Sequence, residues 1–262
     1  MKILFNIPVH ENMDVVCNIV ENIKRFVQNP IIVFHVNPLF RDFDPARLAK
    51  YSDVIVNPTQ LNFIKYQSLL HILMANFYQT ETIDYDYHCF FYSNEMFIRP
   101  GIENYIKDHD CVFEDYRQQE NPRLQELIRA CSEKNYFDPQ LLINNHVEGT
   151  LYSKKLIKQI FDFVLYNMVS ILHSQTSIEE TVIPTLAYMY TTAEKRVPAY
   201  NHFQDWDREL TSEQLNYILE PNQPCLVGHT GYNIFGNTDH IFTVKPVHRT
   251  MQSQLRRLIN SL

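Results

Sequence analysis

The sequence has little glycine, with only five glycines among 262 residues. None of them falls in a G-x-G-x-x-G or G-x-x-x-x-G-K arrangement, so neither common glycine-rich phosphate cradle can form. Any nucleotide must therefore be held by other groups. The formal net charge is −7, which argues against a nucleic-acid partner because the phosphate backbone favours a cationic surface.

Cysteine pairs and long apolar runs are also missing. The five cysteines stand apart without a C-x-x-C pair, which indicates neither a disulfide framework nor a zinc site. No run of about 18 apolar residues occurs, and no basic leader precedes the first strand-like segment. We therefore expect no transmembrane segment and a cytoplasmic protein, with peripheral association at the inner face of a membrane left open.

Short apolar runs alternate with segments of helical periodicity in the first half of the chain. The strand-like runs lie at 2–9, 31–36, 53–56 and 87–92, and the helical segments lie at 11–30 and 62–78. This alternation predicts an α/β fold with a mainly parallel central sheet flanked by helices. The second half is less regular, with an edge strand expected at 144–153 and helices at 122–134, 154–174, from 177 onward and at 249–262.

Polar residues follow three of the expected strands. In open α/β sheets, ligands bind beyond the carboxyl ends of the strands. The residues at those ends are Val9-His10, Val36-Asn37 and Ser93-Asn94-Glu95. We expect them to share one binding crevice, although each is also compatible with an ordinary turn or cap.

Seven segments occur in a recognisable order: IPVHEN, IVFHVN, DYDYHCFFYSNEMFIRP, EGTLYSKKLIKQI, SIEETVIPTL, QDW and IFTVKPV. Their order and spacing resemble the core-2/I-branching β-1,6-N-acetylglucosaminyltransferase family over nearly the whole chain. Asn37 stands where that family has Asp, and Glu95 replaces the Asp of its Ser-Gly-x-Asp signature. The resemblance implies a glycosyltransferase-A-like fold in a single domain, 1–262. This domain would consist of a nucleotide-binding half, 1–110, and an acceptor-binding and catalytic half, 111–262.

The resemblance also implies an activity, the inverting transfer of a sugar from a nucleotide donor to a hydroxyl of a glycan or glycolipid. The expected donor is a UDP-sugar, and UDP-N-acetylglucosamine in particular. Glu180 stands at the position of the family's general base, a role that contributes on the order of 10²- to 10⁴-fold. Lys245 stands at the lysine that contacts the donor diphosphate.

Further binding roles follow from the same resemblance. An arginine that the family places on the diphosphate is missing here, and His229, Arg249 or the backbone amides near Gly231 are the candidates to replace it. Three residues are expected to contact the donor's nucleobase and ribose: Val9, His10 and Asn37. Three are expected on the acceptor side: Glu95, Glu114 and Trp206.

Structural roles compete with the catalytic ones. Ser177-x-x-Glu180 matches a capping box, in which Glu180 would bond back to the helix start, and Thr176-x-x-Glu179 matches one in the next register. Only the second capping box, with Thr176 as the N-cap, leaves the Glu180 side chain available to face a site. Lys245 could likewise be a solvated lysine beside its neighbouring proline.

The carboxylates are poorly placed for a metal. Asp84-Tyr85-Asp86 precedes its strand and is therefore expected at the opposite end of the sheet, and only Glu95 follows the strand. One carboxylate is too little for a hard cation, which takes several oxygen ligands. We predict neither a metal nor a cofactor beyond the donor. The alternatives are a metal-dependent transferase of the same fold and a non-catalytic glycan-binding protein.

Overall fold

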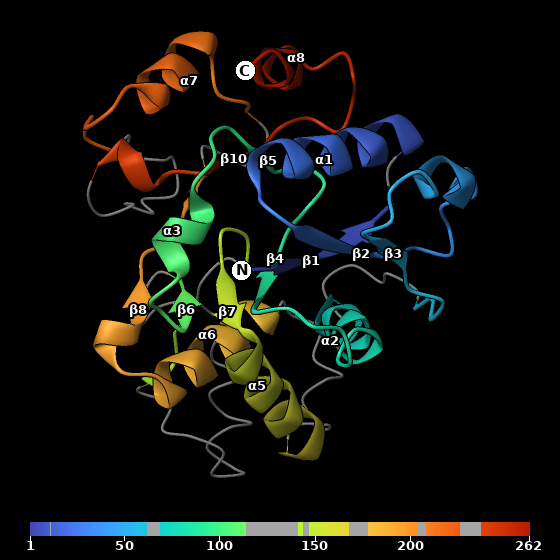
Figure 1. Cartoon of the computed structure of the whole chain (residues 1–262), viewed down its shortest axis with the longest axis vertical. Coiled ribbons are helices and arrows are strands. Elements are labelled where there is room, and N and C mark those ends of the chain that lie inside the picture. The colour runs from blue at the N-terminus through green and yellow to red at the C-terminus, as the bar shows by residue number, and fades with distance from the viewer. Residues whose placement is uncertain are drawn as a thin grey trace.

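The computed structural model describes residues 1–10, 12–61, 69–113, 141–143, 147–167, 178–203, 208–225 and 237–262 (Figure 1). Several predictions lie outside these residues: the helix at 122–134, the two expected caps Thr176 and Ser177, and the binding residues Glu114, Trp206 and His229.

The first half follows the expected alternation. Its elements are β1 (Ile3–Val9), α1 (Met13–Phe26), β2 (Pro30–Val36), the 3-10 helix η1 (Pro45–Leu48), β3 (Val54–Val56), α2 (Leu69–Gln79) and β4 (Tyr87–Phe90). Helix α1 begins where Asn12 accepts a hydrogen bond from the Val15 amide at 3.1 Å. Its apolar positions recur at helical spacing and are buried. The predicted strand–helix–strand unit is confirmed.

From Met96 onward the strands are shorter, at two or three residues each, and helices stand between them. These elements are β5 (Met96–Phe97), α3 (Ile102–Ile106), β6 (Cys111–Val112), β7 (Leu151–Ser153), α5 (Lys154–Asn167), α6 (Glu179–Tyr190), η3 (Ala193–Lys195), β8 (Arg196–Val197), β9 (Asn201–Phe203), α7 (Ser212–Leu219), η4 (Thr238–His240), β10 (Thr243–Lys245) and α8 (Gln254–Asn260). Helix α6 includes a proline, Pro184, in its interior.

Seven strands form the main sheet in the order β3-β2-β1-β4-β7-β6-β8. Strands β3, β2, β1 and β4 are parallel to one another, and β7 runs antiparallel to both β4 and β6. The predicted edge strand at 144–153 is therefore wrong in its placement, because β7 is an interior strand. The strands beyond it, β6 and β8, have two residues each and are too short to give a periodic signal.

A second, three-stranded sheet has the order β5-β10-β9. Strand β10 pairs antiparallel with β5, which follows β4 closely in the chain, and parallel with β9. This sheet brings Lys245, at the end of β10, close to the segment that leaves the carboxyl end of β4.

Helices cover both faces of the main sheet. Helix α1 packs on one face, and α2, α5 and α6 lie on the other (Figure 1). Alternate residues of β1 face α1, whereas Asn6 faces α2 and donates to the Leu73 carbonyl oxygen at 2.8 Å. No helix within the described residues is both long and apolar enough to cross a membrane.

Candidate functional site

The predicted strand ends meet at one edge of the main sheet. Val9 of β1 is in register with Val36 of β2, and the Asn37 amide donates to the Val9 carbonyl oxygen at 3.0 Å. His10, which follows β1, is exposed, and Asn37 is buried with its side-chain oxygen accepting from the Leu39 amide at 2.9 Å. The side-chain oxygen of Asn37 thus shapes the turn after β2. Contact of these residues with a nucleotide stays a prediction.

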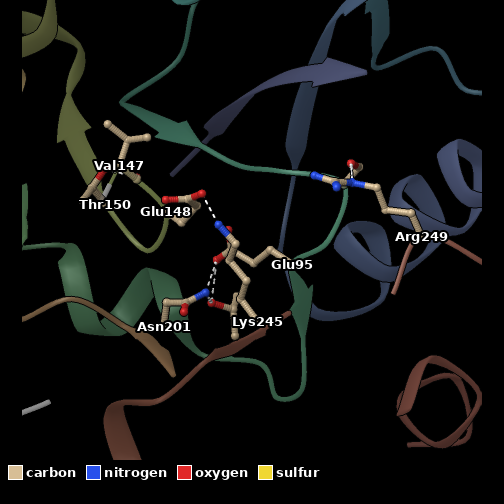
Figure 2. Close-up of polar contacts among 9 residues, drawn as sticks. Glu95, Val147, Glu148, Thr150, Asn201, Lys245 and Arg249 are labelled. Carbon is tan, nitrogen blue, oxygen red and sulfur yellow. Dashed lines mark hydrogen bonds and ion pairs between the residues drawn. The ribbon is translucent and has the colours of Figure 1, made fainter. Parts of the chain in front are cut away.

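Two arginines from the C-terminal segment reach the end of β4. Arg249 donates to the Ser93 hydroxyl oxygen at 2.8 Å (Figure 2). Arg256 is fully buried and donates to the Ser93 carbonyl oxygen at 3.2 Å and to the Asn18 side chain of α1 at 2.8 Å. The fold thus places Arg249, one candidate to replace the family's arginine, at the carboxyl end of β4.

Lys245 lies in a buried ion pair. Its side chain is 5% exposed, and its ammonium pairs with the carboxylate of Glu148 (Figure 2). The same ammonium lies 5.4 Å from the centre of the Tyr92 ring. The alternative of a solvated lysine is therefore wrong. Glu148 has no counterpart among the residues singled out from the sequence.

The turn that carries Glu148 is closely fitted to its surroundings. Gly149 has a φ of +72°, and a Cβ at that position would lie 2.4 Å from the Cβ of Asn201. Only glycine fits there, because both the backbone conformation and the contact exclude a side chain. The Thr150 amide and hydroxyl both donate to the Val147 carbonyl oxygen. The backbone of residues 147–150 thereby fixes the position from which Glu148 reaches Lys245.

Glu95 lies near this ion pair and is fully buried. One of its carboxyl oxygens accepts from the Asn201 side chain at 2.8 Å and from the Thr243 hydroxyl at 2.7 Å. Burial raises the pKa of Glu95 to about 7, against the lowering effect of these two bonds and of the Lys245 charge. A contact between Glu95 and an acceptor sugar stays a prediction.

The raised pKa of Glu95 makes the fold sensitive to pH. The folded chain keeps a proton on Glu95 up to about pH 7, whereas an unfolded glutamate loses it near about pH 4.3. The free energy of unfolding should therefore fall as pH rises between these values, by up to about 1.4 kcal/mol per pH unit. Urea unfolding of the wild type and Glu95→Gln from about pH 5 to about pH 8 measures this, since glutamine keeps both bonds without titrating. Equal slopes for the two proteins would rule the effect out.

Two adjacent glutamates open helix α6. Its N-cap is Ile178, which makes no side-chain cap bond, and the two proposed capping boxes stay untested because their caps lie outside the described residues. Glu179 is buried, and burial followed by the charge of Glu180 raises its pKa well above the ordinary value. Glu180 is half-buried. Glu179 therefore favours its neutral form, and Glu180 is the more accessible of the two.

Tyr92 lies among the charged groups of the site. Burial raises the pKa of its phenol well above the ordinary value, and the charges of Glu148, Glu179, Glu180 and Glu95 raise it further. Lys245 lies on its ring. The lysine from β10 therefore lies beside Tyr92, and the charge of the candidate base from α6 acts on the same phenol, just beyond the carboxyl end of β4. Tyr92, Glu148 and Glu179 lie within segments that resemble the family, yet sequence reasoning gave none of them a role in the site, because their burial and contacts leave no local signal.

The acidic pair before β4 lies elsewhere. Asp84 pairs with the Lys2 ammonium at 2.7 Å, and Asp86 accepts from the Lys2 amide at 2.7 Å, both at the amino end of the sheet. Their predicted role as a loop pair is confirmed. Within the described residues, no group of three or more His, Cys, Asp or Glu side chains is arranged to hold a metal ion. Metal independence itself stays a prediction.

A hollow of about 600 Å³ lies between α1 and η1. Its main charges compensate one another, since Asp14 pairs with Arg47 at 2.7 Å and Glu21 with Lys50 at 3.7 Å. None of the predicted site residues lines it. The group around Tyr92 is therefore the better candidate, because it combines buried charge with the sheet edge where ligands bind.

Comparison with known proteins shows the fold. No protein-family model matches the chain, and a comparison with curated proteins gives no match. Among solved structures, the galactosyltransferase LgtC in complex with donor and acceptor sugar analogs aligns over 100% of this chain and 94% of its own, with 9% identity and a TM-score of 0.51. An active-site mutant of LgtC aligns with the same coverage and identity and a TM-score of 0.52.

These neighbours and the sheet topology establish an α/β fold of the glycosyltransferase-A type, with a mainly parallel central sheet flanked by helices. The predicted fold class is confirmed. At 9% identity the likeness extends to the fold alone. Membership of the core-2/I-branching family stays a prediction.

Proposed function

We propose that the chain is a glycosyltransferase that moves a sugar from a nucleotide donor to a hydroxyl of a glycan. One observation carries this proposal: the Lys245 ammonium lies 5.4 Å from the centre of the Tyr92 ring beyond the carboxyl end of β4, and the charge of Glu180, from a distant part of the sequence, acts on the phenol of the same residue. An ammonium and an accessible carboxylate are the two groups that glycosyl transfer requires, the first for the departing diphosphate and the second for the attacking hydroxyl. The likeness in fold to a galactosyltransferase supports the same activity.

The proposed chemistry is a single inverting displacement. The acceptor oxygen attacks the anomeric carbon of the donor sugar while Glu180 takes the hydroxyl proton. The bond between the anomeric carbon and the diphosphate oxygen breaks, and its electron pair leaves with the nucleoside diphosphate. Lys245 stabilises the charge that develops on that oxygen, which a buried ammonium does well because water screens it little.

The remaining roles follow the sequence resemblance. We propose UDP-N-acetylglucosamine as the donor, with Val9, His10 and Asn37 at the nucleobase and ribose and Arg249 at the phosphates. The position of Arg249 at the end of β4 supports its part, because a guanidinium pairs well with phosphate oxygens. The acceptor is a glycan or glycolipid, reached by a cytoplasmic enzyme that uses no metal.

A donor screen tests this proposal directly. We expect one UDP-sugar to be consumed when the wild-type protein is incubated with a panel of nucleotide sugars, and the rate to be unchanged by EDTA. Mass spectrometry of the released nucleotide and sugar measures it. Loss of turnover in EDTA, restored by manganese, would instead indicate a metal-dependent transferase of the same fold. Binding of glycans without consumption of any nucleotide sugar would indicate a non-catalytic glycan-binding protein.

A further inference from the structure

The pair formed by Glu148 and Lys245 places a carboxylate on the very ammonium that the donor diphosphate requires. Lys245 is almost fully buried and its side chain is 5% exposed, whereas that of Glu148 is 11% exposed. An ammonium buried to this degree costs several kcal/mol unless a counter-charge accompanies it. Before a donor binds, Glu148 supplies that counter-charge.

Nearby negative charge disfavours having both the Glu148 carboxylate and a donor diphosphate beside Lys245. Glu180 lies close enough to Tyr92 for its charge to affect the phenol, as does Glu148, whereas Glu95 and Glu179 favour their neutral forms. A diphosphate on Lys245 would add further negative charge to this group of carboxylates. Like charges held together in a poorly solvated place repel strongly, so the diphosphate and the Glu148 carboxylate compete for the same ammonium.

The construction of the turn shows which part of Glu148 can move. Gly149 is held against Asn201 and Thr150 is bonded to Val147, so the backbone at Glu148 is fixed. Its side chain has three rotatable bonds and is 11% exposed, against 5% for Lys245. A side-chain rotation is therefore the movement by which Glu148 would leave Lys245 while the turn keeps its backbone.

We propose that Glu148 is a displaceable counter-ion of Lys245, which holds the lysine in position before donor binding and competes with the nucleoside diphosphate for it. The proposal rests on the function proposed above, in which Lys245 binds the diphosphate. Glu148 acts through Lys245 and is a positioning residue. Its competition lowers the affinity for both donor and product, because apparent affinity falls with the fraction of molecules whose binding group is available. It therefore speeds release of the nucleoside diphosphate after transfer.

Glu148→Gln tests the competition, with UDP as the probe in isothermal titration calorimetry. Glutamine has the same size and carries no charge, so we expect UDP to bind about tenfold more tightly than to the wild type. In steady-state kinetics, KM for the donor and kcat should both fall, because the product leaves more slowly. In Glu148→Asp the carboxylate is withdrawn by one methylene, so its affinity for UDP should lie between those of the wild type and Glu148→Gln.

Repeating the measurement in the Lys245→Met variant distinguishes competition for the ammonium from simple repulsion of UDP. In Lys245→Met, adding Glu148→Gln should raise UDP affinity clearly less than it does in the wild type, because repulsion remains but there is no ammonium left to compete for. An equal gain in both backgrounds would mean that Glu148 only repels the phosphates, and the proposal would be overturned. Weaker or unchanged UDP binding by Glu148→Gln in the wild-type background would overturn it too.

A crystal structure of the wild type with UDP needs no variant. We expect the Glu148 carboxylate to have left Lys245 and a phosphate oxygen to have taken its place. A structure in which UDP is bound while Glu148 still pairs with Lys245 contradicts this inference and leaves the transferase proposal intact. Failure of the wild type to bind any nucleoside diphosphate would instead remove the proposed function, and the inference with it.

Discussion

Replacing Glu180 with glutamine should lower kcat by about 10²- to 10⁴-fold and leave KM for the donor nearly unchanged. The amide has the size of the carboxylate but cannot take the proton from the acceptor hydroxyl, so only the transition state loses an interaction. Glu180 is half-buried at the start of α6, and its replacement should alter stability little. Initial rates with the donor found in the screen, measured at saturating acceptor, give both constants.

The neighbouring residue provides a matched control for Glu180. Glu179 lies on the same helix turn, but it is buried and its raised pKa favours the neutral acid. An amide in place of a neutral acid changes little, so Glu179→Gln should keep kcat within about tenfold of the wild type. If Glu179→Gln is the inactive variant and Glu180→Gln the active one, the two roles are exchanged and the assignment of the base is wrong.

The parts of the fold that the sequence predicted have strong local signals. Helix α1 repeats its apolar residues every three or four positions and has Asn12 as its cap, and β1 and β2 are seven-residue apolar strands. The position of the strand ends at one edge followed from the alternation of strands and helices. The place of β7 inside the sheet did not, because β6 and β8 carry only two residues each and pair through contacts distant in sequence.

The candidate site shows the same division between local and distant signals. Glu180 and Lys245 were identified through a family resemblance, and their position around Tyr92 required the structure. The partner of Lys245 could not have been found, since Glu148 is 97 residues away and nothing in its segment EGTLYSKKLIKQI marks it as the partner of a lysine. Burial is equally hidden, because Glu95 follows a strand in the sequence as an ordinary turn residue would, yet it is fully enclosed.

Replacing Lys245 with methionine should reduce kcat/KM for the donor by about 10²- to 10³-fold, since the developing charge on the diphosphate loses its buried cation. The same change should also destabilise the fold by about 3–5 kcal/mol, because the Glu148 carboxylate, which is 11% exposed, is left buried without the lysine that pairs with it. Activity and thermal unfolding of the purified variant measure the two effects separately.

The double variant Lys245→Met with Glu148→Gln distinguishes a loss of function from a loss of fold. Removing both charges at once leaves no unpaired ion, so most of the stability should return, as is common when a buried pair is replaced as a unit. Activity should stay as low as in Lys245→Met, because neither methionine nor glutamine carries a positive charge to the leaving group. Recovery of turnover together with stability would mean that Lys245 serves the fold alone, and another cation at the sheet edge, with Arg249 the first to test, would have to act on the diphosphate.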